Sequence, residues 1–202
     1  MRRNEYRESV DIDFLISDIN GYRGIRQGLT GPGGINAITT TPLRQLREVR
    51  ADQYGLRTLL DVDDDEVPLK FDIIHEGRIQ LDPPGPSDQI CGVATLTDLD
   101  AAASKLLANA DRWADPGTFS RDLIDLAMLQ PDPATLGAAI AKAARAYGTS
   151  VERSLHAGIR LLLPEDAGEA AVHWLDKCIT NLQIDVDPGH LQTLVRRLSA
   201  SR

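Results

Sequence analysis

The chain is poor in cysteine, with only Cys91 and Cys178 among its 202 residues. Two cysteines cannot build the disulfide framework of a small secreted protein. They also do not form a Cys-x-x-Cys pair, the spacing typical of structural zinc sites. The sequence therefore favours a protein of the reducing cytoplasm and argues against a zinc site.

Long apolar runs are missing as well. The N-terminus, MRRNEYRESVD, is charged and has no apolar stretch of the kind found in signal peptides. Near the C-terminus the longest purely apolar run is Leu161–Leu163, which is far too short to span a membrane. We expect no membrane association and a cytoplasmic location.

The chain also lacks an excess of positive charge. It holds 22 basic and 30 acidic residues, a net charge of −8, which argues against a protein that coats nucleic acid non-specifically. The first 60 residues differ from the rest, since they carry nine arginines against seven acidic residues. Hydrophobic residues at 42% and charged residues at 26% are ordinary for a folded soluble protein.

Two textures follow one another along the chain, and they predict an α/β protein with a core over 1–95 and a helical domain over 96–202. Alternating apolar residues predict strands over 9–16, 57–62, 69–74 and 78–81, the last three as an antiparallel meander. The segment 28–34, with four glycines, predicts a flexible loop, and the stripe in 42–50 indicates a helix. Capping residues predict helices that begin after Thr97, Ser120, Asp132, Thr149 and Asp187.

The pair Asp11 and Asp13 is the sharpest chemical feature of the sequence. Residues two apart in a strand share a face, so these carboxylates converge and repel one another unless a cation lies between them. Mg²⁺ prefers one or two carboxylates together with substrate phosphates. The alternative interpretation is an exposed edge strand with its acidic residues in solvent.

A second strand, Leu69–Ile74, presents Lys70 and Asp72 on one face. If it lies beside the first strand, Asp72 supplies a third carboxylate and Lys70 a phosphate contact, an arrangement that suits a two-metal site. The alternative is an ordinary amphipathic strand with a Lys–Asp surface pair.

A third group of charges lies in the helical half. Lys105 and Arg112 are seven residues apart and share a helix face, and Asp122 and Asp125 share another. Such cations could hold a triphosphate, although solvated helix faces explain the pattern equally. Other constellations fail: the glycine-rich loop lacks the Gly-Lys-Ser/Thr of a P-loop, and the four histidines lie apart without metal spacing.

In combination, four ordered segments between about residues 6 and 130 resemble the AbiEii/AbiGii toxin nucleotidyltransferases of the polymerase-β-like superfamily, which includes the MenT toxins. Arg7–Phe14 resembles the family's R-x-S-x-D-I-D-F stretch, and Tyr54–Arg57 its segment before a hairpin. Leu69–Ile74 resembles an I-K-[IL]-E strand, with Asp72 in place of Glu. The set Lys105, Arg112 and Arg121–Leu126 resembles its K…R…R-D-L-x-D-L motif.

The resemblance implies a polymerase-β-like core, a small mixed sheet with flanking helices, followed by a helical C-terminal region. It also implies Mg²⁺-dependent transfer of a nucleotide from an NTP to the 3′ end of tRNA, by a toxin with a cognate antitoxin. Asp11, Asp13 and Asp72 would bind the metal, and Lys105 would bind the phosphates. Asp122, in preference to Asp125, would fill the late acidic position of the family. Further candidates for nucleotide contact are Ser9, Lys70 and Arg121.

One departure concerns the start of the chain. Superfamily members carry a Gly-Gly or Gly-Ser turn about ten residues before the paired acids, which here falls at Met1 or earlier. The core is therefore expected to lack its N-terminal helix and phosphate-binding turn. The alternative function is accordingly a catalytically degenerate nucleotidyltransferase-fold module that binds a nucleotide or a partner.

Overall fold

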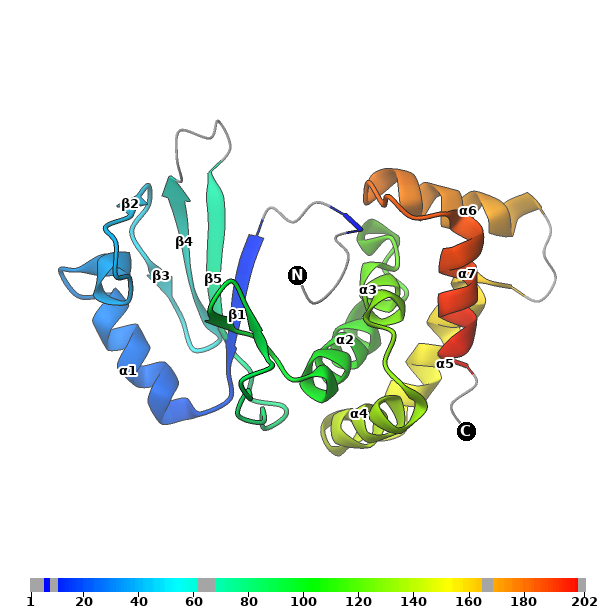
Figure 1. Cartoon of the computed structure of the whole chain (residues 1–202), viewed down its shortest axis with the longest axis horizontal. Coiled ribbons are helices and arrows are strands. Elements are labelled where there is room, and N and C mark those ends of the chain that lie inside the picture. Colours follow the sequence, from blue (N-terminus) through cyan, green and yellow to red (C-terminus); the bar gives the residue numbers. More distant parts are fainter. Residues whose placement is uncertain (1–5, 8–10, 62–67, 165–168, 200–202) are drawn as a thin grey trace. The chain divides into compact units, whose positions relative to one another are not determined.

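The computed structural model describes residues 6–7, 11–61, 68–164 and 169–199. The chain divides into two compact units (Figure 1). The sheet unit is Ser9–Leu81, and the helical unit joins Asp82–Arg202 to the segment Met1–Glu8. Each unit is described by itself.

The sheet unit is built on a mixed sheet in the order β1-β5-β4-β2, with β3 also paired to β4. Its long strands are β1 (Asp11–Ile16), β4 (Gly55–Asp61) and β5 (Leu69–His75), and its short ones are β2 (Arg44–Gln45) and β3 (Arg50–Ala51). β1 runs parallel to β5, while β4 runs antiparallel to β5 and to both short strands. The strand predictions for 57–62 and 69–74 are confirmed to within two residues at each end, and so is the small mixed sheet.

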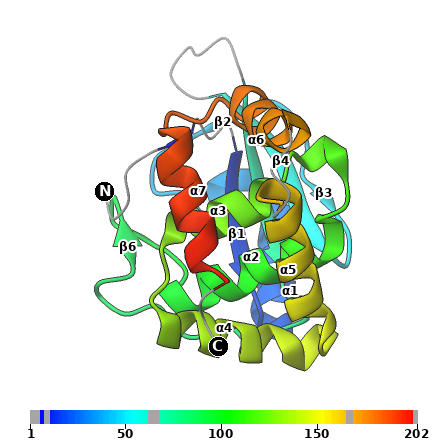
Figure 2. The same ribbon diagram turned by 90° about the vertical axis from the view of Figure 1, so that its right-hand side faces the viewer.

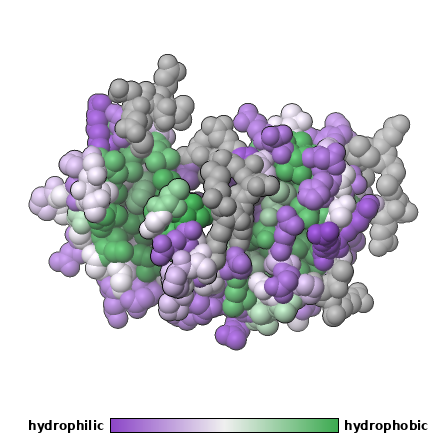
Figure 3. Space-filling model, in the orientation of Figure 1, coloured by the Kyte–Doolittle hydropathy of each residue, from purple (hydrophilic) through white to green (hydrophobic). Residues whose placement is uncertain are grey.

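One face of the sheet is apolar and packs on helix α1 (Ile19–Leu29) and the short 3₁₀ helix Gly34–Ala37. The buried core of this unit consists of Tyr22, Leu29, Ile35, Leu56, Leu60 and Ile73. α1 covers this face only in part, since Ile12 stays 41% exposed and Phe14 and Phe71 are half-buried. Apolar side chains accordingly cover a broad area of the sheet unit in Figure 3.

Helix α1 was not predicted, because glycines at 21, 24 and 28 lower helix propensity. The buried stripe of Tyr22, half-buried Ile25 and Leu29 outweighs that cost, and Asp18 caps the first turn by accepting from the Gly21 N–H. Of the predicted loop 28–34, Gly28 lies inside this helix and Gly34 begins the 3₁₀ helix.

The predicted helix over 42–50 is wrong. This segment forms β2 and β3 instead, and its backbone is held by the Gln45 side chain, which accepts from the Ile35 N–H and donates to the Arg47 carbonyl. Of the expected helical stripe of Leu43, Leu46 and Val49, the first and last pack half-buried against the sheet core, whereas Leu46 is exposed.

The predicted strand over 78–81 is also wrong. The buried Glu76 carboxylate accepts from both the backbone N–H and the guanidinium of Arg78, which folds the chain into a turn. Leu81 N–H donates to the Ser17 hydroxyl and not to a neighbouring strand. The three-stranded meander is therefore a two-stranded hairpin joined by parallel β1.

The helical unit contains six α-helices within its described residues (Figure 2). They are α2 (Asp98–Arg112), α3 (Arg121–Leu129), α4 (Pro133–Tyr147), α5 (Ser150–Leu162), α6 (Glu169–Asn181) and α7 (Pro188–Arg197). A short hairpin, β6 (Gln89–Ile90) with β7 (Val93–Ala94), precedes them. α2 packs on α3, α4 and α5, and α7 packs on α3.

The predicted helix starts are confirmed, although two of the predicted caps are not. Thr97, Asp132 and Asp187 each accept a backbone N–H in the first turn of their helices. Ser120 and Thr149 make no such bond, although α3 and α5 begin directly after them.

The two units divide at Leu81–Asp82, whereas the sequence predicts a division at 95–96. The proline-rich segment 82–87 belongs to the helical unit because Asp82 makes two hydrogen bonds there. Its N–H donates to Asp100, and its carboxylate accepts from Lys142. None of the helices in the described ranges is long and apolar enough to cross a membrane.

Candidate functional site

The face of the sheet opposite α1 carries the acidic residues that the sequence singles out. Parallel pairing of β1 with β5 sets Asp13 opposite Asp72 and Asp11 opposite Lys70. Because residues in register on neighbouring strands project to the same side, the three carboxylates and the ammonium group share one face. The strand of Lys70 and Asp72 therefore lies beside the first strand, as a three-carboxylate site requires.

Lys70 is the counter-ion of two of these carboxylates. Its Nζ lies 3.2 Å from Oδ2 of Asp72 and 3.6 Å from Oδ2 of Asp11. Burial lowers the pKa of Lys70, but the hydrogen bond and charge of Asp72, followed by the charges of Asp11 and Asp13, raise it above its usual value. Lys70 thus stays charged and neutralises part of the acidic cluster.

Asp72 is the buried member of the set, with a side chain only 6% exposed. Its Oδ1 has no hydrogen-bond partner within the described part of the chain, which is unusual for a buried carboxylate oxygen. Across the sheet Arg57 stands in register with Asp72, and its Nε lies 3.9 Å from Oδ2. Asp72 therefore keeps an acceptor atom for a further cation or donor.

The donor set suits Mg²⁺ in its chemistry, since carboxylate oxygens are the ligands that this ion prefers. In the arrangement described, no three His, Cys, Asp or Glu side chains within the described ranges converge tightly enough to hold a metal ion. Asp13 is exposed and Asp11 is half-exposed, so both can reorient, and Lys70 would have to release Asp11 and Asp72. Ser9 lies outside the described residues.

The charged residues of the third motif form an ion-pair ladder between α2 and α3. Lys105 Nζ lies 2.6 Å from Oδ2 of Asp125. In the second pair of the ladder, Arg112 donates from Nε and Nη2 to Asp122, at 2.6 and 2.9 Å. Both carboxylates are only 4% exposed, so the interpretation as solvated helix faces is wrong for Asp122 and Asp125.

Asp125 collects donors from beyond the two helices. Arg7 donates from Nε and Nη2 to its two oxygens, each at 3.2 Å, and the Tyr6 hydroxyl also donates to it. Burial raises the pKa of Asp125, but the charge of Lys105 and the hydrogen bonds from Arg7, Lys105 and Tyr6 bring it below its usual value. Burial and the neighbouring Asp125 raise the pKa of Tyr6 well above the usual phenol range.

The predicted site residues thus fall into two groups, one in each unit. Asp11, Asp13, Lys70 and Asp72 gather on the sheet, whereas Lys105 and Asp122 belong to the ladder of the helical unit. Arg121 begins α3 and is half-buried. Lys105 pairs with Asp125, not with Asp122, which is the carboxylate that the sequence favours for the late acidic position.

Sequence reasoning did not place three residues, Tyr6, Arg7 and Arg57, beside these groups, although Arg7 and Arg57 stand at the ends of segments that resemble the family. Arg57 occupies the alternate position of its strand that shares a face with Asp72, a signal that becomes readable only once β4 and β5 are paired. Arg7 and Tyr6 reach a carboxylate more than a hundred residues away, and no local pattern marks such a contact.

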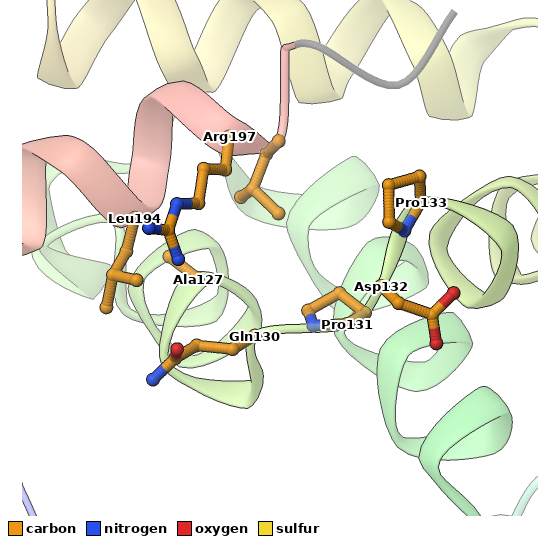
Figure 4. Close-up of a pocket in the computed structure, with 8 residues that line it drawn as sticks. Ala127, Gln130, Pro131, Asp132, Pro133, Leu194 and Arg197 are labelled. Carbon is orange, nitrogen blue, oxygen red and sulfur yellow. The ribbon is translucent and has the colours of Figure 1, made fainter.

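A separate cavity of about 310 Å³ lies within the helical unit and is shown in Figure 4. Its lining is mainly apolar, from Ala127, Pro131, Pro133, Leu194 and Leu198. The lining has two charged residues. Asp132 caps α4 by accepting from the N–H groups of Ala134 and Thr135, and Arg197 has no other candidate catalytic side chain beside it in the lining. This cavity therefore offers no constellation for nucleotide chemistry.

Comparison with known proteins gives one match. A family model described as nucleotidyl transferase AbiEii toxin, type IV toxin–antitoxin system, matches residues 1–187 of the 202. The match extends over most of both units. No curated protein and no solved structure matches the chain significantly.

Proposed function

We propose a function for this chain, which belongs to the AbiEii nucleotidyl transferase toxin family of type IV toxin–antitoxin systems. Membership of the family indicates nucleotide transfer and an antitoxin partner. The finer proposal is a Mg²⁺-dependent transfer of a nucleotide from an NTP to an RNA acceptor, with the 3′ end of tRNA as the acceptor.

One observation carries the proposal: the pairing of Asp13 with Asp72 across β1 and β5. It gathers three carboxylates from two adjacent strands on one face, with Lys70 beside them. Paired acids of this kind, next to a cation that can contact phosphate, are the equipment of phosphoryl and nucleotidyl transfer, in which electrostatics and positioning supply most of the catalysis.

In the proposed reaction the 3′ hydroxyl oxygen of the acceptor forms a bond to the α-phosphorus of the NTP. The bond from that phosphorus to the bridging oxygen breaks, and pyrophosphate leaves. Asp72, whose Oδ1 is available, accepts the proton of the attacking hydroxyl. Lys70 turns from Asp11 and Asp72 to the phosphates, and Lys105 is the candidate phosphate contact of the helical unit.

Asp11, Asp13 and Asp72 would hold Mg²⁺. When bound, the ion would neutralise phosphate charge and lower the pKa of the attacking hydroxyl. Roles for Ser9, Arg121 and Asp122 are proposed from the family resemblance alone.

The test is transfer of label from each of four α-labelled NTPs to total tRNA, with Mg²⁺ or with EDTA. We expect label transfer that needs Mg²⁺ and falls at least about 100-fold in Asp13→Asn, because a missing ligand removes transition-state stabilisation. Asp176→Asn, an exposed carboxylate on α6, is the matched control and should keep wild-type activity.

No transfer by the wild-type protein to any RNA, or equal activity in wild type and Asp13→Asn, would refute the proposal. Tight Mg²⁺-dependent NTP binding without transfer would instead favour the alternative of a degenerate nucleotide-binding module. Calorimetry with each NTP and Mg²⁺ distinguishes a protein that binds NTP without transferring it from one that does not bind NTP.

A further inference from the structure

A row of charged residues crosses the sheet next to the acidic cluster. Arg50 on β3 pairs with Arg57 on β4, Arg57 with Asp72 on β5, and Asp72 with Asp13 on β1. All four stand in register, so all four project to the face opposite α1. Arg57 therefore lies immediately beside the carboxylates proposed for catalysis, and Arg50 lies one strand further out.

The pairing of two arginines is costly in a sheet. Like charges directly opposite each other on neighbouring strands are destabilising. Arg57 has partial compensation, because its Nη1 lies 3.1 Å from Oδ2 of Asp52 and its Nε lies 3.9 Å from Asp72. Arg50 is exposed, and its side chain makes no ion pair or hydrogen bond within the described ranges. The row thus presents positive charge that the sheet unit does not neutralise.

The turn that joins these two strands adds an exposed aromatic residue. Tyr54 is 65% exposed and follows Asp52, whose carboxylate accepts from the N–H groups of Tyr54 and Gly55. Arginines that bind phosphates and aromatic rings that stack on unpaired bases are the two means by which proteins hold single-stranded RNA. Both means occur here on the strand pair β3–β4.

We propose that Arg50 and Arg57 form a subsite for the phosphate backbone of the acceptor RNA strand. This inference rests on the proposed function, in which Asp72 takes the proton of the acceptor hydroxyl. Since Arg57 is the neighbour of Asp72 and Arg50 follows it outward across the sheet, the arginines extend from the point of attack along the acceptor strand. Tyr54 stacks on an unpaired base of that strand.

Binding of labelled total tRNA, followed by fluorescence anisotropy over a range of salt concentrations, tests the subsite without requiring catalysis. The variants are Arg50→Gln, the double variant Arg50→Gln/Arg57→Gln, and Arg50→Lys. The control is Arg23→Gln/Arg26→Gln, which removes the same charge from exposed positions of α1, on the other layer of the unit.

We expect the double variant to bind tRNA about tenfold more weakly, with a salt slope reduced by about 0.7 for each lost phosphate contact. Arg50→Gln should show a smaller loss of the same kind, and Arg50→Lys should keep most of the affinity. Tyr54→Ala should weaken binding without changing the salt slope, because stacking releases no counterions. The control should lie within twofold of wild type.

Steady-state transfer kinetics then separate RNA from NTP. We expect the double variant to raise the KM for tRNA and to leave the KM for NTP within twofold. A raised KM for NTP with unchanged tRNA binding would overturn the inference and assign the arginines to the triphosphate. Equal weakening in the α1 control, or wild-type protein that binds no tRNA, would also overturn it.

Failure of the proposed function looks different. In that case the wild type transfers no label, while the arginine variants still change tRNA binding and its salt slope. If Arg57→Gln disturbs the sheet, as circular dichroism and thermal unfolding would show, Arg50→Gln alone decides the matter, because Arg50 is exposed on a two-residue strand.

Discussion

At the scale of single residues, Asp125 is the carboxylate of the ladder that accepts hydrogen bonds from three different side chains. Tyr6, Arg7 and Lys105 all donate to its buried carboxylate. Replacing it by Asn removes the charge that Arg7 and Lys105 share, and losing one partner of a buried ion pair costs about 3–5 kcal/mol. Because Arg7 and Lys105 are partly exposed, we expect Asp125→Asn to lower the free energy of unfolding by about 2–3 kcal/mol in urea denaturation.

The matched control for that change is Asp176→Asn on α6, an exposed carboxylate, which should alter the free energy of unfolding by less than about 0.5 kcal/mol. An unaltered unfolding free energy in Asp125→Asn would show that the Arg7 and Lys105 contacts contribute nothing to the stability of the fold.

The same carboxylate predicts a dependence on pH. Because the pKa of Asp125 is lower in the folded chain than in the unfolded one, its stabilisation is complete above the ordinary Asp value of about 3.9. The stabilisation is lost as the pH falls through the folded-state value. The difference in Tm between wild type and Asp125→Asn should therefore be constant from about pH 5 to pH 7 and shrink below about pH 4. A difference that widens on acidification would contradict this assignment.

At the scale of helices and strands, two glycines should respond in opposite ways when a side chain is added. Gly137 in α4 is exposed, and a Cβ there would meet nothing within 4 Å. Gly158 in α5 is buried, and a Cβ there would lie 3.1 Å from Cδ2 of Leu123 and 3.2 Å from Oδ1 of Asn109. Close packing of α5 on α2 and α3 thus depends on Gly158.

We expect Gly137→Ala to raise the free energy of unfolding by about 0.5–1 kcal/mol through helix propensity. The larger Gly158→Val should lower it by about 1–3 kcal/mol, because an overpacked contact forces the helices apart. Urea unfolding measures both changes. Stabilisation by the Gly158 substitution would show that α5 does not pack as described.

The elements that could be predicted from sequence are those whose cause is local. Asp132-Pro133 and Asp187-Pro188 predict helix starts because the cap and the proline act within one turn. α1 and the segment 42–50 could not be predicted, since burial against the sheet overrides three glycines in one case and long-range strand pairing overrides a helical stripe in the other. The same reason separates Asp11, Asp13 and Asp72, visible by alternation, from Arg57 and Arg7, whose partners come from distant parts of the chain.

At the scale of the whole molecule, the −8 charge says little about nucleic acid, because charges of both signs are used locally. Lys70 and Arg57 lie among the acids of the sheet, while Lys105 and Arg112 pair with buried carboxylates of the helical unit. The surface row from Arg50 to Arg57 remains available for phosphate in a chain that is acidic overall. The position of a charged residue in the fold therefore decides its role more than the net charge of the chain does.

One buried lysine holds the first residue of the segment with which the helical unit resumes after the sheet unit. Lys142, 10% exposed, donates to Asp100, which is fully buried, and lies 2.9 Å from Asp82, the first residue after the sheet unit. Lys142→Met removes the cation, and within the described ranges the buried Asp100 carboxylate then keeps the Asp82 N–H as its one donor. The segment that follows Asp82 should then come away from α4 and become accessible.

We expect Lys142→Met to be cleaved in the segment 82–95 at least about tenfold faster in limited proteolysis, because cleavage tracks the population of the locally opened form. Arg145→Met, an exposed position on the same helix, should be cleaved at the wild-type rate. If Lys142→Met is cleaved no faster than this control, the lysine does not hold the segment. If it is cleaved throughout both units, the buried pair supports the fold of the helical unit as a whole, and the segment is released only because that unit unfolds.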